Sequence, residues 1–89
     1  MSVIELSGVL GPLDALDVRR SLDAATSQPR PQILLDLSAV ESLHPAVAAA
    51  IVRGSRRARR GAGQLRVIEP TSAAGDRLFR LASLPAILR

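Results

Sequence analysis

The chain has 89 residues, enough for one domain with a small core, and no cysteine, which excludes disulfide scaffolds and thiolate metal sites. Phe79 is the only aromatic residue, so base stacking on single-stranded nucleic acid has almost no support. All twelve basic residues are arginine and the net charge is +4, but an alanine-rich, lysine-free composition is also typical of a GC-rich genome. We expect one domain over residues 1–89, without a cofactor.

The N-terminal part of the chain predicts a strand followed by a helix. Residues 3–9 alternate between two faces as a strand does, and Gly11-Pro12 ends that pattern. Asp14 is placed to cap a helix that runs to about Thr26. Apolar residues at three- and four-residue spacing would form its inner face: Ala15, Val18, Leu22 and Ala25.

The middle of the chain predicts a second strand and a second helix. Residues 27–31 contain two prolines and read as a loop, after which the apolar run at 33–37 predicts a central strand. This strand would be covered on both faces and parallel to the first. Pro45 suits the first position of a helix whose first turns are apolar and whose end is basic, up to Gly61.

The C-terminal part predicts a third strand at 64–69 and a helix capped by Ser72, with an ion pair between Asp76 and Arg80. Residues 84–88 would pack as a tail or a short strand. The alternation of strands and helices predicts an α/β fold with a small, mostly parallel (mixed) sheet flanked by helices. Without a signal sequence or an apolar run of membrane-spanning length, we expect a cytoplasmic protein that does not insert into a membrane.

Four segments together resemble a STAS domain, the fold of bacterial anti-sigma factor antagonists. They are LSGVLGPLDALDVRRSL, ILLDLSAV, RRARRGAGQLRVIEP and LFRLASLPAIL, in this order and at this spacing. The resemblance covers nearly the whole chain. It implies a small sheet flanked by helices that binds a protein partner and performs no chemistry of its own.

The sequence departs from the family pattern at its opening and at its switch. The opening Gly-Glu-Leu-Asp is here residues 8–11, Gly-Val-Leu-Gly, and the strand that commonly precedes it is missing, which would leave a sheet edge open to a partner or to a second copy. In the family, the third residue of an Asp-Ser-Ser/Thr-Gly turn is phosphorylated. The aligned residues here are His44, Pro45, Ala46 and Val47, so Ala46 is a degenerate phosphosite without a hydroxyl group.

The resemblance implies a partner interface at Leu43, His44, Pro45, Ala46 and Val47, at the start of the second helix, to which the first helix would also contribute. His44 could also serve as a pH sensor or a phosphate acceptor, but a cap on the helix is the simpler interpretation. Asp36 has no catalytic partner at useful spacing, and we expect it to hydrogen-bond a nearby turn. The sequence offers no credible enzyme active site.

Three functions remain open on this basis. The first is a protein-interaction module that binds an anti-sigma factor or related kinase without a phosphorylation switch. The second is a STAS subunit of a lipid-transporting ATP-binding-cassette system, in contact with a permease or ATPase. The third is nucleic-acid binding by the arginines at 53, 56, 57 and 60. The alternative for these arginines is a helix face that only contacts solvent, and we favour this interpretation.

Overall fold

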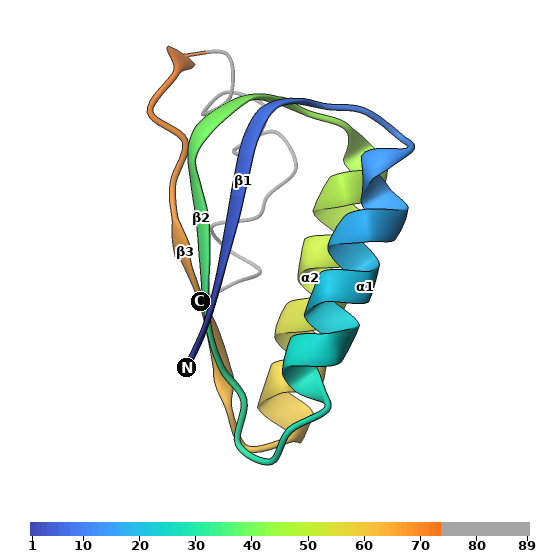
Figure 1. Cartoon of the computed structure of the whole chain (residues 1–89), viewed down its shortest axis with the longest axis vertical. Helices are drawn as coiled ribbons and strands as arrows, with labels where there is room; N and C mark the ends of the chain where they lie inside the picture. The colour runs from blue at the N-terminus through green and yellow to red at the C-terminus, as the bar shows by residue number, and fades with distance from the viewer. Residues whose placement is uncertain (74–89) are drawn as a thin grey trace.

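The computed structural model describes residues 1–73 and contains five elements. They are β1 (Ser2–Leu10), α1 (Asp14–Thr26), β2 (Gln32–Leu43), α2 (Pro45–Arg60) and β3 (Gln64–Ile68). The strands form one sheet in the order β1-β2-β3, and both pairs are parallel. Figure 1 shows α1 and α2 side by side on one face of this sheet. The predicted α/β fold is therefore confirmed, with a sheet that is parallel throughout the described residues.

The strand β2 ends six residues beyond the predicted end at Leu37. In this additional part, two irregularities change which side chains face the core. The pairing with β1 shifts by one residue after Asp36 and again after Val40, so β2 has an extra residue at each place. Each extra residue turns the next side chains by half a period. Buried residues accordingly follow a spacing of two up to Leu37 and of three from there to Val40 and Leu43. The apolar run at 33–37 therefore predicts only the first part of the strand.

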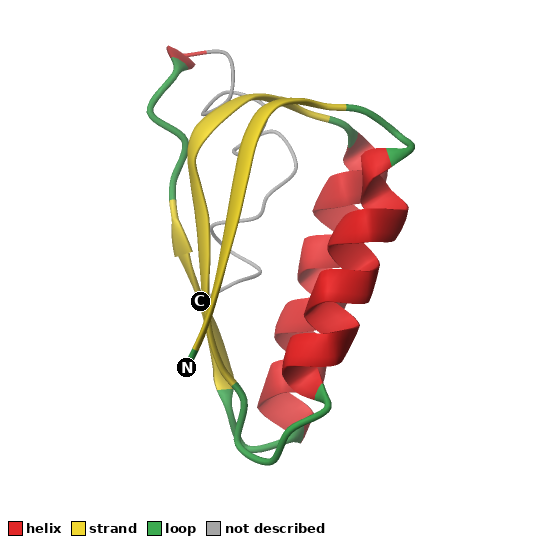
Figure 2. Ribbon diagram, viewed as in Figure 1, coloured by secondary structure: helices red, strands yellow, loops and turns green. Residues whose placement is uncertain are grey.

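Figure 2 shows the sheet facing the layer of two helices, and the buried core residues come from both layers. Leu35, Leu37 and Ile51 are fully buried there. The opposite face of β2 is half-buried at Leu34 and Asp36, and the expectation of a strand covered on both faces stays a prediction. At the contact between the helices, a Cβ atom built on Gly54 would lie 2.8 Å from the Leu22 Cδ1 atom. The missing side chain lets α1 and α2 approach closely.

Both helices begin and end near the predicted residues, with one correction. Asp14 is the first residue of α1 rather than its N-cap, which is Leu13 and makes no capping side-chain bond. The Asp14 carboxylate instead accepts a hydrogen bond of 2.7 Å from the Gly11 amide and so stabilises the turn before the helix. The expected helix after Ser72, the Asp76–Arg80 pair and the tail at 84–88 lie outside the described residues.

Candidate functional site

Both helices start at the same end of the sheet. Because β1 and β2 are parallel, both strands end there, and the helix that follows each strand starts there as well. Figure 1 shows the starts of α1 and α2 next to each other. The His44 amide donates to the Leu10 carbonyl at 2.9 Å and joins the end of β2 to the end of β1. The start of α2, where the sequence predicted a partner interface, is therefore positioned by the sheet itself.

His44 is the N-cap of α2. Its backbone is extended (φ −67°, ψ 144°), Pro45 occupies the first helical position, and the His44 Nδ1 atom accepts a hydrogen bond of 3.0 Å from the Ala46 amide. An acceptor at Nδ1 requires that the imidazole be neutral, with its proton on Nε2. The side chain thus satisfies one of the free amides at the helix start, which is the usual task of an aspartate, asparagine or serine.

The five residues of the predicted interface divide into two groups. Leu43 and Val47 are buried, with 5% and 0% of their surface exposed, and they hold the end of β2 and the first turn of α2 in the core. His44, Pro45 and Ala46 are exposed. Only these three residues can contact a partner without a change in structure.

Two exposed leucines extend this exposed group on the neighbouring helix. Leu13, just before α1, is 89% exposed, and Leu16 in its first turn is 52% exposed. Neither leucine belongs to the inner stripe of α1, and the interface predicted from the sequence included the first helix without naming these two residues. We call Leu13, Leu16, His44, Pro45 and Ala46 together the apolar end of the helix layer.

The apolar end has no hydroxyl group that could be phosphorylated. Ala46 has no hydroxyl, and Ser42 is half-buried within β2, where it pairs with Val9. Among residues 1–73, no group of three or more histidine, cysteine, aspartate or glutamate side chains could hold a metal ion. In the same part of the chain, no helix combines the length and apolarity needed to span a bilayer.

One aspartate on α1 forms ion pairs with two of the four arginines at 53, 56, 57 and 60 on α2. Asp23 Oδ1 lies 2.9 Å from the Arg57 Nη1 atom and 3.1 Å from the Arg53 Nη1 atom. A third arginine, Arg19, is 4.0 Å from Asp23 Oδ2. Arg53 and Arg57 thus join the two helices, a role that the sequence analysis missed because their partner is thirty or more residues away. Arg56 and Arg60 face solvent.

Asp36 has a local structural role at the first irregularity of β2. Its Oδ1 atom accepts a 2.9 Å hydrogen bond from the Ser38 amide, and hydrogen bonds with Ser38 lower the pKa of the Asp36 carboxyl. The Ser38 carbonyl accepts from the Thr71 hydroxyl at 2.8 Å. The expected hydrogen bond of Asp36 is present, although it lies within a strand and not at a strand end. The Asp36 carboxylate gives the Ser38 amide a hydrogen-bond partner at the place where the extra residue interrupts the backbone pairing of β1 with β2.

Comparisons with known proteins agree with this architecture. The family model described as "Mlab, STAS domain" matches residues 1–89. No curated protein matches the chain significantly.

Proposed function

Because the chain belongs to the STAS domain family, we propose that it is a protein-interaction module of the anti-sigma factor antagonist type. The STAS domain is a non-enzymatic interaction fold, and the family includes both anti-sigma factor antagonists and STAS domains of transporters. In this proposal the chain is a single cytoplasmic domain over residues 1–89, without cofactor or nucleic acid. Its partner is an anti-sigma factor or a related kinase. A homodimer through the edge strand β1 stays a prediction.

The observation that carries the proposal is the exposed apolar end of the helix layer. Leu13 and Leu16 expose large side chains to solvent at 89% and 52%, beside Pro45 and Ala46 at the start of the next helix. Burying a leucine that is exposed in the free protein stabilises a complex by about 1.5–3 kcal/mol. Adjacent exposed apolar residues on a rigid scaffold are typical of a protein contact. Leu43 and Val47 support this surface from within.

The start of α2 also determines how such binding would be controlled. A phosphate on the third residue of the family turn would lie at a helix N-terminus, where its charge would disfavour an apolar partner surface. Ala46 cannot carry that phosphate. We therefore propose that binding is constitutive or follows the amount of protein, and is not switched by phosphorylation at this residue.

The test is affinity capture from the native cytoplasm with wild type and Ala46→Asp, which places a negative charge in the apolar end. We expect wild type to retain a soluble ATPase-fold kinase and the variant to lose it. Ala24→Asp is the matched control, because it makes the same substitution at an exposed alanine of α1 away from the apolar end. Equal retention by all three proteins would exclude the apolar end as the interface, and phosphate incorporation from ATP and the captured kinase would contradict constitutive binding.

A second candidate function is favoured by the description of the matching family model, which names the Mlab STAS domain. In this alternative, the chain is the STAS subunit of a lipid-transporting ATP-binding-cassette system and the apolar end contacts the permease or its ATPase. Capture of a membrane permease complex in place of a soluble kinase would support it. The same variants apply, because both functions use the same surface.

A further inference from the structure

The positive charge of this protein is concentrated in its helix layer. α1 has two arginines and three aspartates, and α2 has five arginines and no acidic residue, so the layer has a net charge of +4. This equals the net charge of the whole chain, whose other acidic and basic residues cancel. The layer is thus the basic face of an otherwise neutral molecule.

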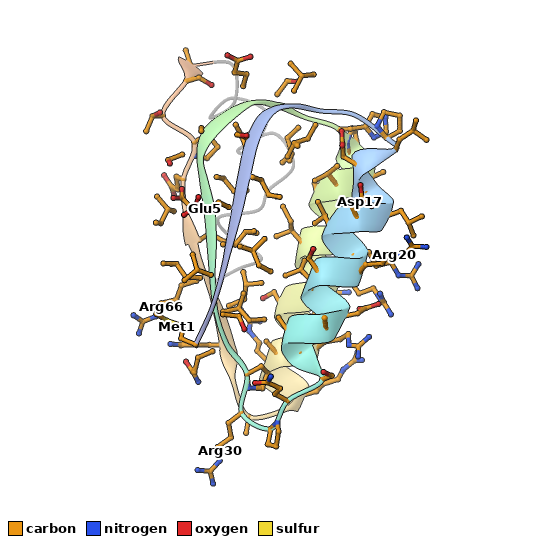
Figure 3. The ribbon with its side chains drawn as sticks, viewed as in Figure 1. Met1, Glu5, Asp17, Arg20, Arg30 and Arg66 are labelled. Atoms are coloured by element: carbon orange, nitrogen blue, oxygen red, sulfur yellow. The ribbon has the colours of Figure 1, made fainter. Side chains whose placement is uncertain are left out.

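The basic residues lie in the middle of α1 and in the second half of α2. We define the arginine surface as Arg19, Arg20, Arg53, Arg56, Arg57 and Arg60. Asp23 is the acidic residue within it, and it holds Arg53 and Arg57 at 3.1 Å and 2.9 Å, so these two guanidinium groups are fixed in place. Arg20, Arg56 and Arg60 are exposed around this fixed centre. Figure 3 shows Arg20 pointing outward from α1, away from the sheet.

We propose that the arginine surface binds the headgroups of an anionic membrane and that the protein lies on the bilayer by its helix layer. Two neighbouring helices, each about 10 Å in diameter, form a face about 20 Å wide. That face is too wide for the DNA major groove of about 12 Å, but it suits an extended anionic plane. Arginine is also well suited to this contact, because its guanidinium group forms paired hydrogen bonds with phosphate oxygens.

The inference does not depend on the proposed function, because the arginine surface shares no residue with the apolar end. On α2, Arg56 follows Pro45 by eleven residues, which is about 16 Å along the helix axis, whereas on α1 Arg19 and Arg20 are about one turn from Leu16. Each basic residue near an anionic bilayer raises the affinity for the membrane by a factor of up to about ten. Added salt screens the charges and reduces this contribution.

The test is sedimentation of the full chain with phosphatidylcholine vesicles that contain no anionic lipid or about 30% phosphatidylglycerol, at about 50 mM and about 500 mM NaCl. We expect binding to the anionic vesicles alone, and its loss at the higher salt concentration. Arg56→Glu should weaken binding about tenfold, and Arg56→Glu with Arg60→Glu about a hundredfold. Both residues are exposed and have no acidic partner in the described residues, so circular dichroism should show an unchanged fold.

Arg66→Glu is the matched control. It makes the same change in net charge, but Arg66 is an exposed residue of β3 and lies on the side of the sheet away from the helices, as Figure 3 shows. We expect its vesicle binding to stay within about twofold of wild type, because the charge is lost at a distance from the bilayer. An equal loss in Arg56→Glu and Arg66→Glu would show a response to net charge alone and would overturn the proposal. Absence of binding to anionic vesicles at low salt, or displacement from the vesicles by duplex DNA of equal phosphate concentration, would overturn it as well.

Discussion

The cap at the start of α2 leads to a prediction about stability at the candidate site itself. His44 accepts the Ala46 amide through Nδ1 at 3.0 Å, and the first turn of α2 contains no acidic residue. Asp at this position would accept the same amide and would add a negative charge at the positive end of the helix dipole. His44→Ala would leave the amide to water. The two substitutions should therefore change stability in opposite directions.

The magnitudes follow from the exposure of the site. Loss of a capping side chain costs about 0.5–2 kcal/mol, and the lower part of this range applies here because water reaches the exposed Ala46 amide. We expect His44→Ala to destabilise the protein by about 0.5–1 kcal/mol. His44→Asp should stabilise it by a similar amount, since a charge at a helix terminus contributes about 0.3–1 kcal/mol and aspartate is the better cap. For a domain of this size, about 1 kcal/mol corresponds to a shift in Tm of about 4–8 °C.

The assay is urea unfolding followed by circular dichroism near neutral pH, with thermal unfolding as a second measurement. The midpoint should rise for His44→Asp and fall for His44→Ala, while the slope of the free energy against urea stays constant. Added salt should reduce the gain of His44→Asp but not the loss of His44→Ala, because only the former depends on charge. If His44→Ala is as stable as wild type, the histidine cap contributes nothing and the argument is refuted.

Two further predictions concern the packing of the helices and the irregular strand. Gly54→Val should destabilise the protein by about 1–3 kcal/mol in urea unfolding, because its Cβ would lie 2.8 Å from the Leu22 Cδ1 atom in a buried contact, and unchanged stability would show that the helices can move apart. The lowered pKa of Asp36 predicts a pH effect: the carboxylate stabilises the fold above the unfolded-state pKa of about 3.9, and this contribution is lost as the pH falls through the lower pKa of the folded state. Asp36→Asn should therefore weaken the dependence of stability on pH below about 4, and an identical pH profile for variant and wild type would contradict the assignment.

The sequence alone determined the order and type of the described elements and the start of α2. Local physics is sufficient for these features: Pro45 begins a helix, Gly61 ends it, and an apolar run between two loops forms a central strand. The absence of a hydroxyl at Ala46 is likewise a property of the sequence.

Only the tertiary structure decided which residues of the predicted interface face solvent and which residues join them. Burial depends on neighbours distant in the chain, so Leu43 and Val47 became core residues while Leu13 and Leu16 became exposed beside Pro45. The same reason explains the arginines of α2. Their helical spacing was visible in the sequence, but Asp23 lies thirty residues before Arg53, and it reaches this arginine only because two parallel strands bring α1 and α2 side by side. Pairwise contacts across the chain require the fold, whereas caps, turns and strand runs require only their immediate neighbours.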